Sequence, residues 1–171
     1  LHHYNQALEI AKELVNKRSM AFWFGNIGGV YHGQGAYPKA LLHYNQALEI
    51  DKELGNKTGM ALEIGNIGNV YAKQGAYLKA LYHYNEALKI DKELGNKSGM
   101  AIRFGNIGIL YAILGTQAKK AHKQDSLYAL ALEHYHRSIQ IAEEIGYKLM
   151  IANSRTSLAS LYIKQNNAIQ A

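Results

Sequence analysis

Histidine is the residue type in this chain that could do chemistry most directly, because its imidazole is a common metal ligand. The sequence has eight His. Four of them recur at an equivalent place in successive segments, at His3, His43, His83 and His134. Packed helices lie about 8–10 Å apart, whereas a zinc–nitrogen bond is about 2.0–2.1 Å long. Members of such a row cannot share one ion, so we expect neither a metal site nor a cofactor.

Glycine-rich and polar runs are the other candidates for a catalytic site. The tripeptide Gly-Asn-Ile recurs at Gly25, Gly65 and Gly105 and superficially resembles a phosphate-binding loop. Such a loop follows a strand, whereas these glycines lie within a helical periodicity. The polar residues follow the repeat and do not converge on a Ser, His and Asp grouping. We therefore predict that the chain is not an enzyme.

An internal repeat positions all of these residues. Residues 21–60 and 61–100 align without a gap, differ at 11 of 40 positions and share the other 29. Residues 1–20 match the second half of a unit, and residues 152–171 match the first half. We expect the sequence to begin and end in mid-repeat within a longer protein. A fixed period of this length indicates a solenoid whose neighbouring units cover one another's apolar faces.

Each unit is predicted to form two helices. Apolar or small residues recur at helical spacing in both halves of one copy, first at Phe24, Ile27, Gly28 and Tyr31, then at Ala40, Tyr44, Ala47 and Leu48. Gly35 and Gly55 follow the two stripes, as expected of a residue that tolerates positive φ at a helix end. Gly28 should lie where two helices cross closely, because a larger side chain would overpack that contact.

The two stripes resemble the tetratricopeptide-repeat family. The matching pattern is Phe24-x-x-Ile27-Gly28-x-x-Tyr31, followed by Ala40-x-x-x-Tyr44 and Ala47. Lys52 and Lys92 stand where the family usually has Pro, and the period is 40 residues. The chain thus looks like the variety found in spindle-orientation adaptors, kinesin light chains and bacterial signalling arrays.

The resemblance implies an all-α fold, a right-handed superhelical solenoid of antiparallel helix pairs. It would hold about four units, with half-units at both ends. A single solenoid over residues 1–171 would divide into segments 1–19, 20–59, 60–99, 100–147 and 148–171.

An insertion interrupts the third unit near residues 116–126. Its 11 residues amount to about three helical turns. We expect the first helix to continue past Gly115 towards His122, with Asp125 or Ser126 capping the next helix. The segment would carry a basic group of side chains: Lys119, Lys120, His122 and Lys123. It is either a solvated extension or a docking point for an acidic partner.

By the same resemblance, the first helix of each unit lines a concave groove that binds a peptide. Asn26, Asn66 and Asn106 recur on that helix, and a side-chain amide offers a peptide backbone both a donor and an acceptor. These amides could instead bond a neighbouring repeat. Trp23, Glu63 and Arg103 differ at one equivalent position, which marks either ligand selection or a difference in packing. The positions expected in the groove are Phe22, Asn26, Leu62, Asn66, Asn69, Ile102, Arg103, Asn106, Ser157 and Ser160.

Composition narrows the choice of partners. The formal net charge is +6, which favours acidic partners through long-range attraction. The first helices lack the Lys and Arg in every unit that RNA binding would need, so we do not expect a nucleic-acid partner. No apolar run approaches the roughly 20 residues that span a bilayer. The chain has no Cys, which leaves the compartment open, and we expect a cytoplasmic protein.

The sequence therefore predicts a protein-interaction scaffold that binds a peptide or partner segment in a concave groove. Two alternatives stay open. One is a structural solenoid that stacks end to end, as a homo-oligomer joined through its exposed ends. The other is a regulatory array within a larger signalling protein.

Overall fold

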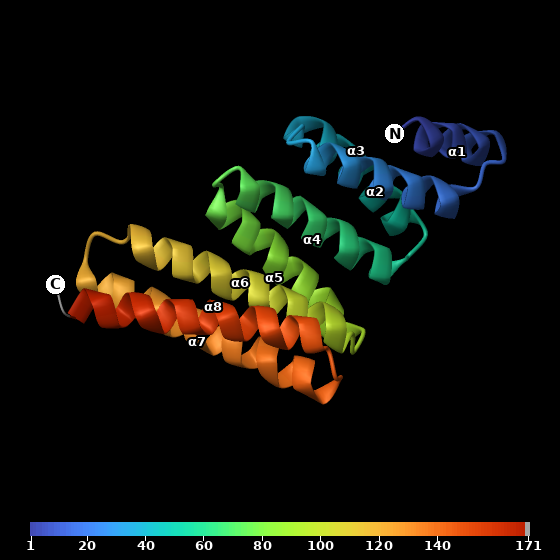
Figure 1. Cartoon of the computed structure of the whole chain (residues 1–171). Helices are drawn as coiled ribbons and strands as arrows, with labels where there is room; N and C mark the ends of the chain where they lie inside the picture. Colours follow the sequence, from blue (N-terminus) through green and yellow to red (C-terminus); the bar gives the residue numbers. More distant parts are fainter. Residues whose placement is uncertain (170–171) are drawn as a thin grey trace. The chain divides into compact units, whose positions relative to one another are not determined.

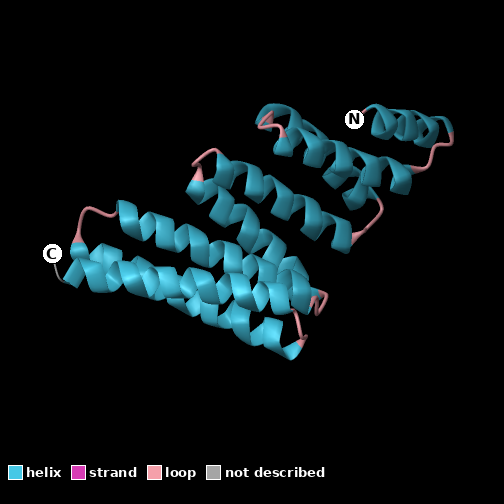
Figure 2. Ribbon diagram, in the orientation of Figure 1, coloured by secondary structure: helices cyan, strands magenta, loops and turns pink. Residues whose placement is uncertain are grey.

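The computed structural model describes the backbone of residues 1–169 and the side chains of residues 1–164 (Figure 1). The described part of the chain is helical and contains no strand, and short loops join its helices (Figure 2). The helices are α1 (His2–Glu13), α2 (Lys17–Gly33), α3 (Tyr37–Glu53), α4 (Lys57–Lys73), α5 (Tyr77–Glu93), α6 (Lys97–Gln117), α7 (Ala121–Glu144) and α8 (Lys148–Ile169). Neighbouring helices pack side by side: α1 on α2, α2 on α3 and α3 on α4, and likewise α6 on α7 and α7 on α8.

The chain forms two compact units, Leu1–Ile90 and Asp91–Ala171. The first contains α1 to α4 and most of α5, and the second contains α6, α7 and α8. The division into repeat segments within one continuous solenoid stays a prediction.

Helix ends follow the repeated residue types. Asn56 and Asn96 are the N-caps of α4 and α6, and their side-chain oxygens accept hydrogen bonds from Gly59 and Gly99. Such caps satisfy backbone N–H groups that have no partner within the helix. The chain reverses through glycines with positive φ at positions 35, 55, 75, 95 and 146, a conformation that glycine adopts at little steric cost.

The close helix crossings are confirmed at three glycines. A Cβ atom added to Gly28 would lie 2.7 Å from the ring of Tyr44, and one added to Gly68 would lie 2.7 Å from the ring of Tyr84. The equivalent distance from Gly108 to the ring of Tyr135 is 2.8 Å. These tyrosines are buried, so each glycine leaves the space that one core aromatic ring fills.

Three of the four recurring histidines pack inside the helix pairs. Each stacks on a tyrosine of the preceding helix, with ring centroids 5.2–5.4 Å apart: His43 on Tyr31, His83 on Tyr71 and His134 on Tyr111. Burial is the main cause that lowers the pKa of these three imidazoles. Within the described residues, no group of three or more His, Asp or Glu could hold a metal ion.

The insertion is shared between two helices. α6 ends at Gln117 and does not reach His122, so the predicted extension of the first helix is too long. α7 begins at Ala121 after Lys120, which makes no side-chain capping bond, and the predicted caps at Asp125 and Ser126 are wrong. The cause is Gly115, which stays helical and packs under the ring of Tyr128. With Tyr128 packed on α6 at Gly115, Asp125 and Ser126 lie inside α7 and not at its N-terminus. Most of the insertion therefore lengthens α7.

α6 is the helix of the described residues that comes nearest to a membrane span. By length and composition alone, this helix of 21 residues could span a bilayer, and the mean hydropathy of its most apolar 18 residues is 1.2. Half of its most apolar stretch is buried inside the protein. A core helix of a globular unit has these properties too.

Candidate functional site

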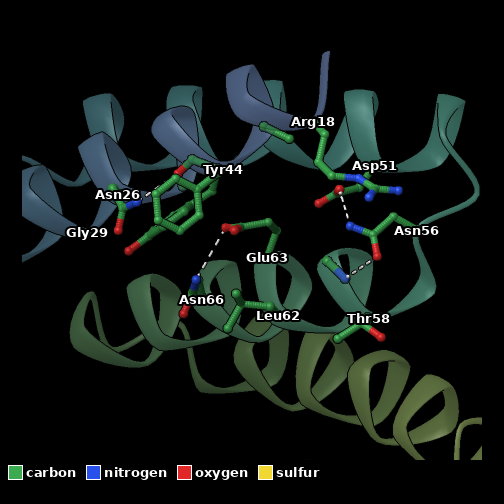
Figure 3. A pocket seen from close by; sticks show the side chains of 14 residues that line it. Arg18, Asn26, Gly29, Tyr44, Asp51, Asn56, Thr58, Leu62, Glu63 and Asn66 are labelled. Atoms are coloured by element: carbon green, nitrogen blue, oxygen red, sulfur yellow. Dashed lines mark hydrogen bonds between the residues drawn. The ribbon is translucent and has the colours of Figure 1, made fainter. Parts of the chain in front are cut away.

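A hollow of the first unit lies between two first helices of successive repeats. Residues of α2 and α4 form its walls, and α3 contributes Tyr44 and Asp51 (Figure 3). Its volume is about 490 Å³. The side chains that decide its chemistry are Arg18, Phe22, Asn26, Tyr44, Asp51, Asn56, Leu62, Glu63 and Asn66.

Four of the predicted groove residues meet in this pocket. Phe22 and Asn26 come from α2, and Leu62 and Asn66 come from the equivalent positions of α4. Phe22 is 61% exposed and Leu62 is 54% exposed. Two large apolar side chains therefore remain open to a ligand at the pocket, where covering them would be favourable.

The two amides make only local hydrogen bonds. Asn26 donates from Nδ2 to the carbonyl oxygen of Phe22 at 3.0 Å, within its own helix. Asn66 donates from Nδ2 to Oε2 of Glu63 at 3.2 Å. Each bond uses one of the two amide hydrogens and leaves the amide oxygen as an acceptor.

Two carboxyl groups in the pocket were absent from the predicted site. Asp51 of α3 is 4% exposed and Glu63 of α4 is 5% exposed. Figure 3 shows Asp51 at the same end of the pocket as Arg18, and Glu63 beside Asn66. Arg18 is itself exposed. Acidic residues are rarely buried this deeply without a charged partner.

Local chain geometry explains the position of Asp51. The carboxylate accepts a hydrogen bond of 2.7 Å from Nδ2 of Asn56, the N-cap of α4. A Cβ at Gly59 would collide with this carboxylate, so the missing side chain makes room for it. The negative group thereby lies at the N-terminus of α4, where the helix dipole favours an anion.

Burial changes the acidity of both groups. It raises the pKa of Glu63 to about 7, against a hydrogen bond from Asn66 that lowers it, and the nearby Asp51 raises it further. Burial also raises the pKa of Asp51, against the hydrogen bond from Asn56. Glu63 therefore exchanges its proton near neutral pH.

Comparison with known families now identifies the repeat. Two family models described as tetratricopeptide repeat match residues 1–53 and 61–94. The chain belongs to the tetratricopeptide-repeat family. Repeats of this family are protein-interaction modules and typically not enzymes.

Solved structures share the fold of this tetratricopeptide-repeat chain. The apo form of RapI is 22% identical with a TM-score of 0.79, over 96% of this chain and 56% of RapI. BtubC (BKLC) from P. vanneervenii is 18% identical with a TM-score of 0.62, over 95% of this chain and 72% of that protein. The chain thus spans little more than half the length of RapI. No curated protein matches it.

The other predicted groove residues of the tetratricopeptide-repeat chain lie outside this pocket. Asn69 accepts a hydrogen bond of 2.8 Å from the hydroxyl of Tyr84 and so joins α4 to α5. Five belong to the second unit, namely Ile102, Arg103, Asn106, Ser157 and Ser160. Arg103 is 7% exposed, and its Nε lies 3.5 Å from Oδ2 of Asp91. It is a buried ion-pair residue of that unit.

The two serines of α8 differ in exposure. Ser160 is exposed, whereas Ser157 is half-buried. Burial raises the pKa of Tyr135 of α7 to about 12, and the nearby Ser157 hydroxyl opposes this rise.

Proposed function

We propose that the chain binds a peptide segment of a partner protein in the pocket between α2 and α4. The observation that carries the proposal is the pair of exposed apolar side chains, Phe22 and Leu62, beside the amides of Asn26 and Asn66. Apolar contacts would hold side chains of the segment, and the amides would meet its backbone. The family supplies the general role of a protein-interaction scaffold.

A matched pair of leucines tests the location. Leu62 in the pocket is 54% exposed, and Leu42 on α3 is 57% exposed and does not line it. Retention of a library of capped heptapeptides by the immobilised chain should fall at least fivefold with Leu62→Ser. It should stay within twofold of the original with Leu42→Ser. Equal losses for the two variants would contradict binding at this pocket.

Self-association is a second candidate, because apolar side chains are also exposed at α1. Ile10 is 56%, Leu14 is 71% and Val15 is 76% exposed. Ile10 and Leu14 line a second hollow of about 250 Å³ together with Trp23. A mass that rises with concentration in light scattering, and that Leu14→Ser lowers, would favour this candidate. A cytoplasmic location and a regulatory role in a larger signalling protein stay proposals.

A further inference from the structure

The buried acid pair of the first pocket occupies a site that every repeat contains. One position lies near the end of a second helix and the other on the following first helix. Its four occupants are Ala11 with Trp23, Asp51 with Glu63, Asp91 with Arg103, and Ala142 with Ser154. Among these described pairs, two carry no charge, one joins an anion to a cation, and only Asp51 with Glu63 combines two acids.

The third pair shows that the aspartate at this position can form an ion pair with a cation. Asp91 is bound as Asp51 is, because Nδ2 of the N-cap Asn96 donates to its Oδ1 at 2.6 Å. Asp91 is 1% exposed, and its other oxygen faces the buried guanidinium of Arg103. The architecture around Asp51 is the same, but Glu63 stands where the arginine would be. At this position of the repeat the first unit therefore has Glu63 in place of that cation, and the exposed Arg18 lies at the Asp51 end of the pocket.

Glu63 is directed into the pocket with one oxygen unused. Its Oε2 accepts from Asn66, and among the described residues no hydrogen-bond donor reaches its Oε1. Gly25 faces that oxygen, and a Cβ there would crowd it. A carboxylate that is 5% exposed and still opens onto a cavity is available to a ligand donor and to little else.

We propose that the pocket takes the side chain of an arginine in the bound segment, with its guanidinium against Glu63. Phe22 and Leu62 would cover the aliphatic stem of that arginine. A guanidinium suits the site better than an ammonium, because it is planar, weakly hydrated and able to donate two parallel hydrogen bonds to one carboxylate. The inference rests on the proposed peptide binding and names the chemistry of the segment.

The charged and titratable groups around Glu63 set the pH dependence. They are Arg18 of α2, Tyr44 and Asp51 of α3, and Glu63 itself on α4. Tyr44 stays neutral, because burial raises its pKa to about 12. Since Glu63 loses its proton near pH 7, the arginine should bind more tightly at pH 8 than at pH 6, and its binding should release a proton.

Two peptide libraries test the proposal on the full chain. Both are capped heptapeptides with randomised flanks, one with arginine at the centre and one with citrulline, its neutral isostere. At pH 8 the arginine library should be retained at least tenfold better, and the preference should fall severalfold at pH 6. Glu63→Gln should reduce the preference to less than threefold, because the neutral amide cannot pair with the guanidinium.

Glu49→Gln is the matched control, because it removes the same charge from an exposed position of α3. This variant should keep the arginine preference, and an equal loss in it would show long-range attraction and overturn the site. Equal retention of both libraries by the unmodified chain would overturn the arginine proposal and leave peptide binding intact. Retention of neither library would overturn both proposals. As a second readout, the carboxyl carbon signal of Glu63 should titrate at lower pH when the arginine library is bound, and an unchanged midpoint would count against the contact.

Discussion

Glu63→Gln should stabilise the chain at alkaline pH and have little effect at acidic pH. The pKa of this carboxyl rises from 4.5 to about 7 on folding, so the folded state binds the proton more tightly than the unfolded state. A carboxyl of this kind contributes stability that is fully present below about pH 4.5 and lost as the pH rises through 7. At about 1.4 kcal/mol for each pKa unit, the ionised form costs the fold about 3 kcal/mol.

Glutamine keeps the size of the side chain and an oxygen that can accept from Asn66, but it has no charge to bury. From pH 5 to pH 8, the parent chain should lose about 2–3 kcal/mol of unfolding free energy relative to the glutamine variant. For a protein of this length, that corresponds to roughly 5–10 °C in melting temperature at pH 8. Urea denaturation at the two pH values measures the difference.

Glu49→Gln provides the comparison, because Glu49 is exposed and pairs with Lys52 on the protein surface. Its stability difference from the parent should be small and nearly independent of pH. If Glu63→Gln were less stable than the parent at pH 8, Glu63 would be ionised and paired within the folded chain. That result would refute both the burial argument and the proposal that Glu63 is available to an arginine of a ligand.

Two further predictions concern packing and the second unit. Gly68→Ala should lower the free energy of unfolding by about 1–3 kcal/mol, because its Cβ would press on the ring of Tyr84. The control is Gly33→Ala, whose Cβ would meet nothing within 4 Å and which should be neutral or stabilise by up to about 1 kcal/mol. Equal shifts in melting temperature for the two variants would contradict the close helix crossing at Gly68. Arg103→Ala should destabilise the fold by roughly 3–5 kcal/mol, because it leaves Asp91 buried without its cation. Chemical denaturation measures this loss. Adding Asp91→Asn to the same variant should recover part of it, because the buried charge is then removed.

The fold could be predicted from the sequence because its signals are local and repeated. Gly68 and Tyr84 recur with the same separation in successive copies, and each copy independently indicates the same helix pair. The insertion was harder to place, since turn lengths alone allow either helix to grow. The contact of Tyr128 with Gly115 decides between them, and it exists only in three dimensions.

The candidate site could be predicted only in part. The apolar positions and the amides follow from the repeat, because equivalent positions on successive first helices share a face. The sequence around Asp51 does not mark it as a site residue, because the same seven-residue segment occurs again around Asp91. What distinguishes the two aspartates is the partner across the helix interface, Glu63 or Arg103, and this pairing depends on how neighbouring helices pack.

The most direct test of the account maps where a retained peptide touches the chain. Side-chain amide signals of Asn26 and Asn66 should shift in NMR spectra when the peptide pool eluted from the immobilised chain is added back. The side-chain amide signal of Asn45, which lies on α3 outside the pocket, should stay in place. Shifts confined to Trp23 and its neighbours on α1, with the two amides unchanged, would contradict binding in the pocket between α2 and α4.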